Sequence, residues 1–492
     1  MKRILSLVLV FLMLVPTAFT VGCVKEKEEG STVLRICNCE DYIDEDLLGE
    51  FTEQTGIEVI YSTYGTNENL YNELVINPNS YDLVVPSEYM IENLAVEGRL
   101  NKLDLTKVPN YQNNVSKYIG ERLHDKIFEV EKGEYAGETT SISEYMVGYM
   151  WGTMGWVYNT DNVSVDDVSA WGNVFKNPAL NKKVTIKDAV RDSYLVGLAM
   201  VYEDELRSST TTEQITEILN RKEIENIEKV GEKLNSLKPM LYGFEVDSGK
   251  NDIVLGNIDA YVAWSGDAAY AIDVAAGEAE DEDGTIVENT RSLSYYIPDE
   301  GSNIWFDGFC MPSGSNNYDA VYEFLNFISA PENVIRNMDY TGYTSMVAGD
   351  DIFNEIALGW FDESEDLNED EGVSVDLSYF FGEGDYTVKV SEEGYGRLIA
   401  QYPTKEIADR CAIMGYFNST TLMDINDMWE SVKGETFPLW AIIFTVALVI
   451  VLVVLIILYR NREKIKWFKL PERKTTYAER KNLKVIKKEY ID

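Results

Sequence analysis

Residues 33–85 alternate between strand-like and helix-like segments, and this alternation limits the fold more than any other feature of the chain. Strands are expected at 33–37, 57–62 and 81–85, and helices with apolar residues on one face are expected at 44–55 and 68–76. A β-α-β-α-β order with right-handed crossovers forms a parallel sheet with helices on its faces. The sequence therefore predicts an α/β fold built on a doubly wound parallel sheet.

The third of these strands ends at Pro86, which cannot donate a hydrogen bond to a sheet, and a short polar loop follows it. Ser87 and Tyr89 lie in this loop. Ligand crevices in open α/β sheets form outside the carboxyl ends of the strands. We therefore expect Ser87 and Tyr89 to lie at the mouth of a ligand site.

A second α/β lobe is predicted after residue 145. Aromatic residues crowd between 144 and 159, which indicates a crossover. The elements that follow are strands at 183–186, 259–264 and 305–311, and helices at 193–202, 212–237, 318–329, 331–339 and 420–433. We assign residues 33–145 and about 308–350 to lobe 1, and residues 146–307 and about 351–433 to lobe 2.

The chain is strongly acidic, with 43 Lys and Arg against 84 Asp and Glu and a formal net charge of −41. A phosphate backbone requires a basic footprint, so nucleic acid is excluded as a partner. An acidic surface attracts cations, although it also simply favours solubility. The acidic stretches at 278–283 and 362–371 are predicted to be solvated loops.

Residues for catalysis and metal binding are scarce. The chain has a single histidine, His124, and lacks G-x-S-x-G, H-E-x-x-H and phosphate-loop patterns. Histidine and cysteine are too few for a clustered zinc site. We therefore predict a binding function rather than an enzyme, with no catalytic residues, no metal and no cofactor.

Both ends of the chain carry membrane signals. A basic start and a short apolar run predict a signal peptide at 1–22, followed by a charged tether at 23–32. The residues around Cys23 resemble a bacterial lipoprotein cleavage box with a lipidated cysteine; an uncleaved anchor is the alternative. Residues 439–459 carry no charge and are long enough to span a bilayer as a helix. The basic tail at 460–492 then lies in the cytoplasm, and the acidic part of the chain lies outside the bacterial cell membrane.

Aromatic residues stand beside carboxylates at several predicted strand and helix ends. These groups are Asp41 and Tyr42, Asp192 and Tyr194, Trp264 and Asp267, and Trp305 and Asp307, while Tyr343 follows a helix. Organic ammonium ligands are bound by both kinds of side chain: cation–π contacts contribute about 0.5–2 kcal/mol each, and charge-assisted hydrogen bonds contribute about 1.5–3 kcal/mol. The pattern favours a cleft for an organic cation, although a single aromatic residue is more often part of a core.

The same residues carry a family resemblance. The chain resembles the spermidine/putrescine-binding proteins of ABC transporters over residues 33–433, most clearly in the segments 38–42, 59–64, 67–68, 81–89, 305–307 and 342–343. The resemblance implies two α/β lobes of the periplasmic-binding-protein type, joined by a hinge and closing on an extended polyamine. It also implies an ABC permease and an ATPase as partners. These would be separate chains, because this chain has one predicted span.

The resemblance also implies roles for individual residues. The aromatic box around the methylene chain would consist of Tyr42, Tyr89, Trp264, Trp305 and Tyr343. The ammonium groups would be bound by Asp41, Asp192 and Asp307, and Ser87 would supply a hydroxyl. Two positions depart from the family's pattern: Cys39 stands where the family has tryptophan, and Ala189 stands where a second acid can occur. These departures leave the choice between putrescine and spermidine open.

Two alternatives to a polyamine importer remain. The same fold could bind another small solute, such as an amino acid, a sugar or ferric iron, although iron favours tyrosine and histidine ligands without tryptophan walls. A sensor or scaffold could instead use the membrane helix to conduct a signal, with the basic tail binding a partner or anionic lipid. The predicted function is a membrane-anchored solute-binding component of a polyamine ABC importer.

Overall fold

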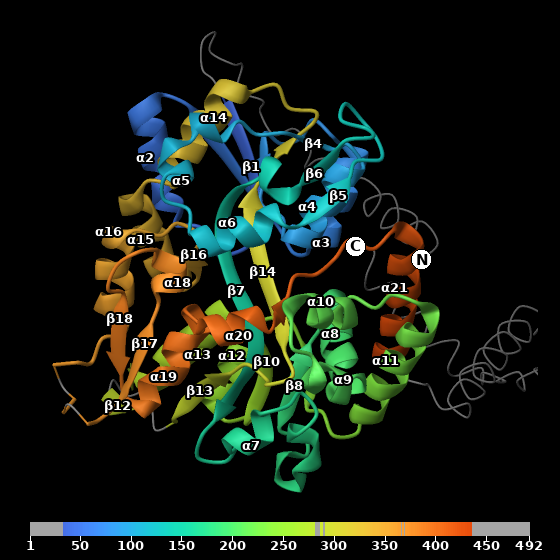
Figure 1. The fold of residues 1–492 in the computed structure, drawn as a ribbon, viewed down its shortest axis with the longest axis vertical. Helices are drawn as coiled ribbons and strands as arrows, with labels where there is room; N and C mark the ends of the chain where they lie inside the picture. The colour runs from blue at the N-terminus through green and yellow to red at the C-terminus, as the bar shows by residue number, and fades with distance from the viewer. Residues whose placement is uncertain (1–32, 281–285, 289–290, 366, 369, 435–492) are drawn as a thin grey trace, which may run out of the picture. The chain divides into compact units, whose positions relative to one another are not determined.

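The computed structural model describes residues 33–280, 286–288, 291–365, 367–368 and 370–434 (Figure 1). The compact unit described below ends at Val432. The predicted signal peptide, Cys23 with its tether, the predicted span at 439–459 and the basic tail all lie outside the described residues. Within the described ranges, no helix is both long and apolar enough to cross a membrane.

The first sheet contains three parallel strands in the order β2-β1-β3. The elements follow one another as β1 (Val33–Cys39), α2 (Glu45–Thr55), β2 (Glu58–Tyr64), α3 (Asn67–Ile76) and β3 (Leu83–Val84). The predicted β-α-β-α-β order is confirmed, although β3 is shorter than the segment predicted at 81–85.

Local capping sets the limits of α2. The Asp44 carboxylate accepts a hydrogen bond from a backbone N–H of the first turn, and the helix ends at Gly56, whose φ of 73° lies in the left-handed region. Leu47, Leu48 and Phe51 form the buried face of the helix. These signals are local in the sequence, which explains why the boundaries of α2 were predictable.

The longest strand, β7 (Val147–Asn159), lies in the segment predicted as an aromatic crossover, and all 13 of its residues are buried. It belongs to an eight-stranded sheet with the order β19-β14-β7-β10-β8-β9, and two further strands, β13 and β16, also pair with it. The partners are β8 (Val184–Lys187), β9 (Gly243–Glu245), β10 (Ala260–Trp264), β13 (Leu293–Tyr296), β14 (Ser302–Phe309), β16 (Thr344–Ser345) and β19 (Cys411–Ala412). Figure 1 shows β7 and β14 side by side, and they pair in antiparallel fashion.

The strand β7 contributes to two separate clusters of buried apolar side chains. Trp151 belongs to the cluster that contains Leu34 and Phe51. Trp156 belongs to the cluster that contains Trp171. The strand therefore passes from one core to the other, as expected for a two-lobe α/β fold.

Helices pack around both sheets. They include α4 (Glu88–Val96), α6 (Lys117–His124), α8 (Val190–Val201), α12 (Gly249–Leu255), α13 (Ser265–Ala276), α14 (Tyr318–Ile328), α15 (Pro331–Thr341), α19 (Glu392–Gln401) and α21 (Ser419–Lys433). The shorter elements include β4 (Leu100–Asn101), α5 (Pro109–Gln112), β5 (Ile127–Glu129), β6 (Thr139–Ser141), α7 (Val165–Val168), α9 (Glu203–Ser208), β15 (Met311–Pro312), a π-helix (Phe353–Leu358), β17 (Val373–Asp376), α18 (Ser378–Phe381), β18 (Thr387–Val390) and α20 (Lys405–Asp409). Part of the first acidic stretch is not a loop: β11 (Glu278–Glu280) pairs with β12 (Ile286–Glu288).

The helix predicted at 212–237 is in fact two helices, α10 (Thr212–Leu219) and α11 (Ile224–Leu237). Asn220 ends the first of them. Its Nδ2 donates to Ile413 O at 3.0 Å, and its Oδ1 accepts from Gly415 N–H at 2.6 Å. Nδ2 also donates to Thr216 O at 2.9 Å, a local bond that competes with helix continuation. Nothing in the helical periodicity of the segment reveals the two tertiary bonds.

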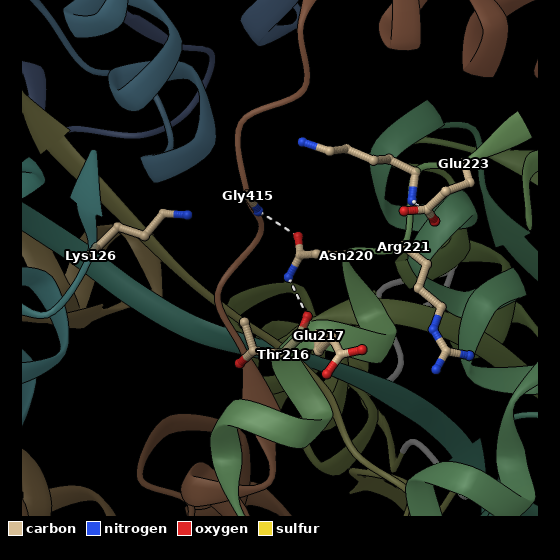
Figure 2. Close-up of a pocket in the computed structure, with 8 residues that line it drawn as sticks. Lys126, Thr216, Glu217, Asn220, Arg221, Glu223 and Gly415 are labelled. Atoms are coloured by element: carbon tan, nitrogen blue, oxygen red, sulfur yellow. Dashed lines mark hydrogen bonds between the residues drawn. The ribbon is translucent and has the colours of Figure 1, made fainter. Parts of the chain in front are cut away.

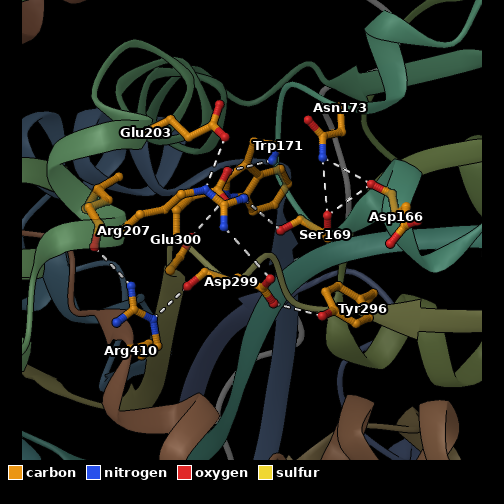
Figure 3. A network of polar contacts seen from close by, with 12 residues as sticks. Asp166, Ser169, Trp171, Asn173, Glu203, Arg207, Tyr296, Asp299, Glu300 and Arg410 are labelled. Carbon is orange, nitrogen blue, oxygen red and sulfur yellow. Dashed lines mark hydrogen bonds and ion pairs between the residues drawn. The ribbon is translucent and has the colours of Figure 1, made fainter.

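A buried carboxylate lies immediately before β14. Glu300 Oε1 accepts a hydrogen bond from Trp171 N–H at 2.7 Å, and Oε2 lies 3.4 Å from Arg207 Nη2 (Figure 3). Arg410 donates to the carbonyl of Asp299 at 2.7 Å. Burial raises the pKa of Glu300 to about 7, partly opposed by the Trp171 hydrogen bond. This network holds the start of the strand that carries Trp305 and Asp307.

Replacing Glu300 by alanine is expected to lower the free energy of unfolding by about 1–3 kcal/mol, because the Trp171 N–H would be buried without an acceptor. Glu203→Ala is the matched control. Glu203 also pairs with Arg207, but its side chain is partly exposed, so a loss below about 1 kcal/mol is expected. Urea denaturation followed by tryptophan fluorescence measures both losses, and equal values would contradict the role given to burial.

Candidate functional site

Asp307 lies among buried aromatic side chains and is itself 8% exposed. The Tyr42 hydroxyl donates to Asp307 Oδ2 at 2.7 Å, whereas Oδ1 makes no hydrogen bond with any residue that the structure describes. Burial raises the pKa of Asp307 to about 6, while the nearby hydroxyls of Ser87 and Tyr42 favour the ionised form. Oδ1 is therefore a buried acceptor that a donor group of a ligand could satisfy.

Three aromatic rings form a cluster at this carboxylate. The Tyr343 ring lies edge-on to Tyr42, with centroids 5.2 Å apart, and edge-on to Trp305, with centroids 5.5 Å apart. The Trp305 indole N–H donates to Thr153 O of β7 at 3.3 Å, which holds the ring in place. The structure thus brings together four of the nine residues predicted to contact a ligand.

Ser87 joins this group through the backbone. An isolated antiparallel bridge pairs Ser87 with Asp307, next to a hydrogen bond from Gly308 N–H to Pro86 O at 3.2 Å. Ser87 also precedes the first residue of α4. The Asn67 amide contacts Ser87 twice, accepting from its N–H at 3.1 Å and donating to its Oγ at 3.0 Å. These hydrogen bonds therefore link the start of α3 to the start of α4 beside Asp307.

Cys39 is the last residue of β1 and is partly buried. Burial, and then the negative charge of Asp307, raise the pKa of the Cys39 thiol to about 12, so the group is neutral. The structure thus places a small neutral side chain near the Asp307 carboxylate, at the position where the resemblance implied a tryptophan.

Tyr89 lies in a second group of polar side chains. Its hydroxyl donates to Glu68 Oε1 at 3.1 Å. The guanidinium carbon of Arg191 lies 4.7 Å from the centre of the Tyr89 ring. This contact joins α4, which begins beside the first sheet, to α8, which begins beside the second.

Trp264 likewise has a cation against one face. Lys187 Nζ lies 4.1 Å from the centre of the Trp264 ring and 3.1 Å from Asp267 Oδ2. The Tyr343 hydroxyl donates to the other oxygen of Asp267, Oδ1, at 3.3 Å. Asp267 therefore links the Trp264 group to the aromatic cluster around Asp307.

Asp192 lies in the first turn of α8 and is partly buried. Burial raises its pKa to about 6, while a hydrogen bond from Trp264 and the charge of Lys187 favour the ionised form. The structure thus places Asp192 near Trp264.

Asp41 lies apart from the buried groups. It occupies the turn after β1 with a φ of 50°, in the left-handed region that aspartate tolerates, and its side chain is exposed. The sequence shows that Asp41 is adjacent to Tyr42, but the direction of the side chain depends on this backbone conformation.

Four residues of the site were not among the nine predicted ligand contacts: Glu68, Lys187, Arg191 and Asp267. Lys187 is the last residue of β8, and Asp267 lies in the first turn of α13 just after β10. The rule that ligand crevices form at the carboxyl ends of strands could have found Lys187. Asp267 is the carboxylate noted beside Trp264 in the sequence. The contacts of Glu68 and Arg191 with Tyr89 join distant segments and have no local signal.

A separate surface groove of about 540 Å³ contains none of the predicted residues (Figure 2). It is lined by Lys126, Thr216, Glu217, Asn220, Arg221, Lys222, Glu223 and Gly415. No aromatic side chain lines it, and basic groups outnumber acidic ones, so it does not fit an organic cation. In the described part of the chain, no group of His, Cys, Asp or Glu side chains is arranged to hold a metal ion.

Comparison with known proteins agrees with this geometry. Residues 46–349 match the family described as bacterial extracellular solute-binding protein. The spermidine/putrescine-binding periplasmic protein of Salmonella typhimurium is 26% identical over 327 residues, which cover 66% of this chain and 81% of the relative. The putrescine-binding periplasmic protein SpuD of Pseudomonas aeruginosa is 30% identical over 307 residues, which cover 61% of this chain and 74% of the relative.

Solved structures share the fold. The spermidine/putrescine ABC transporter substrate-binding protein PotD of Streptococcus pneumoniae is 26% identical, with a TM-score of 0.55 over 82% of this chain and 99% of that one. The TpPotD lipoprotein of Treponema pallidum is 20% identical, with a TM-score of 0.56 over the same shares of the two chains. The resemblance to spermidine/putrescine-binding proteins is therefore confirmed. The chain is a solute-binding protein rather than an enzyme, and it belongs to the family of bacterial extracellular solute-binding proteins.

Proposed function

We propose that this protein is the solute-binding component of an ABC importer and captures a polyamine in the cleft around Asp307. The observation that carries the proposal is the buried, unpaired Oδ1 of Asp307 beside the rings of Tyr42, Trp305 and Tyr343. A ligand ammonium would donate to Oδ1 and lie against the aromatic faces. The names of the relatives, which specify putrescine and spermidine, support this ligand class.

The remaining proposed contacts come from both sides of the cleft. Ser87 and Tyr89 lie at the start of α4, and Asp192 and Trp264 lie at the starts of α8 and α13. A ligand that touches both sides binds the closed arrangement more tightly than an open one, and this difference drives closure. Asp41 is left out of the contact set because its side chain is exposed.

The proposal includes an anchor at each end of the chain. A lipid on Cys23 and a membrane helix at 439–459 would hold the binding lobes outside the cell membrane, with the tail at 460–492 in the cytoplasm. The lobes would be residues 33–145 with about 308–350, and 146–307 with about 351–433. Two anchors raise the effective concentration of the receptor near its permease. The permease and the ATPase would be separate chains. The periplasmic location named for the relatives supports a position of the lobes outside the cytoplasm.

Polyamine affinity is expected to fall as the pH is lowered through about 6. The pKa of Asp307 is raised to about 6, and the proton must leave before an ammonium can bind, whereas ligand ammonium groups stay charged throughout this range. Between pH 7.5 and pH 5.0 we expect the Kd for putrescine to rise about tenfold from Asp307 alone, and further if Asp192 titrates with it. Calorimetric titrations across this range measure the change.

Asp307→Asn is the control for this pH dependence. The asparagine cannot titrate, so the contribution of this position to the slope of log Kd against pH should disappear even though binding is weaker. A wild-type Kd that stays constant between pH 7.5 and 5.0 would contradict a direct contact between the ligand and Asp307.

A further inference from the structure

Two of the aromatic rings proposed to face the ligand already carry a cation from the protein itself. Lys187 Nζ lies 4.1 Å from the centre of the Trp264 ring, and Arg191 Cζ lies 4.7 Å from the centre of the Tyr89 ring. Lys187 is 1% exposed and Arg191 is 5% exposed. These are cation–π contacts of the kind that a ligand ammonium would make. The protein's own cations therefore occupy one face of each ring, where an ammonium group of a longer polyamine would otherwise bind.

Contacts within the protein hold both cations in place. Lys187 donates to Val246 O at 2.6 Å in addition to its pairing with Asp267. Arg191 donates through Nη2 to Gly415 O at 2.9 Å, and its guanidinium carbon lies 4.0 Å from the centre of the Phe417 ring. Because a buried cation is costly once it loses its partners, a ligand is expected to bind beside these groups rather than displace them.

Carboxylates lie beside both cations. Glu68 and Asp192 are near Arg191, and Glu245 and Asp267 are near Lys187. The two cations therefore neutralise part of the negative charge that a ligand's ammonium groups would otherwise meet. Asp307 supplies a further carboxylate beside Tyr42.

We propose that Lys187 and Arg191 are built-in cations that restrict this cleft to short diamines and reject triamines such as spermidine. The inference rests on the proposed polyamine function and narrows its ligand class. A third ammonium would meet like charges and would find one face of Tyr89 and one face of Trp264 occupied. Arg191 Nη1 is buried and makes no hydrogen bond with the described residues. Because a guanidinium N–H is a donor, it cannot accept a hydrogen bond from a ligand ammonium.

Calorimetric titration of the full chain in detergent at pH 7.5, with putrescine and with spermidine, tests this inference. We expect a Kd for putrescine at least about tenfold lower than that for spermidine, a difference of about 1.4 kcal/mol. A spermidine Kd equal to or lower than the putrescine Kd would overturn the selectivity and leave the polyamine function standing. Heat from neither polyamine, with clear binding of an amino acid or a sugar, would overturn the proposed function itself.

Arg191→Gln tests the cause of the selectivity. Glutamine removes the charge but keeps an amide that can donate to Gly415 O. We expect the preference for putrescine over spermidine to fall at least about fivefold, mainly through tighter spermidine binding. Arg221→Gln is the matched control: Arg221 also lies over a tyrosine ring, that of Tyr202 at 4.3 Å, but outside the cleft, so the preference should not change.

Thermal unfolding shows whether each variant is folded. An unchanged preference in folded Arg191→Gln would overturn the role given to Arg191. The wild-type comparison of the two polyamines needs no variant, so it decides the selectivity even if Arg191→Gln does not fold.

Discussion

Asp307→Asn is expected to raise the Kd for putrescine at least about tenfold, because the ligand would lose a charge-assisted hydrogen bond worth about 1.5–3 kcal/mol. The substitution keeps the shape of the side chain and an oxygen that can accept from the Tyr42 hydroxyl, which lies 2.7 Å from Asp307 Oδ2. The effect should therefore fall on the ligand more than on the fold. Isothermal titration calorimetry with putrescine measures the loss.

Asp41→Asn is the matched control for this substitution. It removes the same charge from an exposed side chain near Tyr42 in the sequence, and we expect less than about a twofold change in Kd. Equal losses in the two variants would point to a general effect of net charge. Wild-type affinity in Asp307→Asn would remove Asp307 from the site.

Trp305→Ala is also expected to weaken putrescine binding at least about tenfold. The indole lies edge-on to Tyr343 at 5.5 Å and is only 8% exposed, so its removal opens the wall beside Asp307 and lets water reach the carboxylate. A lost cation–π contact contributes about 0.5–2 kcal/mol, and the lost burial of the methylene chain adds to it. The same calorimetric titration measures this effect.

Trp305→Phe separates the aromatic face from the indole hydrogen bond. Phenylalanine keeps a ring against Tyr343 but cannot donate to Thr153 O, so we expect most of the affinity to remain. Thermal unfolding of both variants reports any loss of stability from the cavity that alanine leaves. Wild-type affinity in folded Trp305→Ala would exclude the ring as a ligand contact.

The elements that were predicted correctly have local causes. Asp44 and Gly56 mark the ends of α2 within the segment itself, and buried Leu47, Leu48 and Phe51 follow the helical period. The alternation of strands and helices between Val33 and Val84 was also predicted from local patterns. This alternation put Ser87 after the third strand, beside the site. The position of Ser87 follows from strand order alone, because the carboxyl ends of parallel strands share one edge.

The features that were missed depend on contacts between distant segments. The break between α10 and α11 is held by Asn220 bonding to Ile413 and Gly415. The cations over Tyr89 and Trp264 are set by packing between segments that meet only in the fold. No periodicity or spacing in the sequence encodes which face of a ring an arginine or a lysine will cover.

Polyamine binding itself is tested most directly by calorimetric titration of the wild-type protein with putrescine, spermidine, an amino acid, a disaccharide and ferric citrate. We expect saturable heat with putrescine and a Kd at or below about 100 μM. This Kd corresponds to a binding free energy of about −5.5 kcal/mol or more negative. No heat with any polyamine, together with clear binding of the sugar, the amino acid or the iron complex, would contradict the assignment of the proposed site around Asp307 to an organic cation.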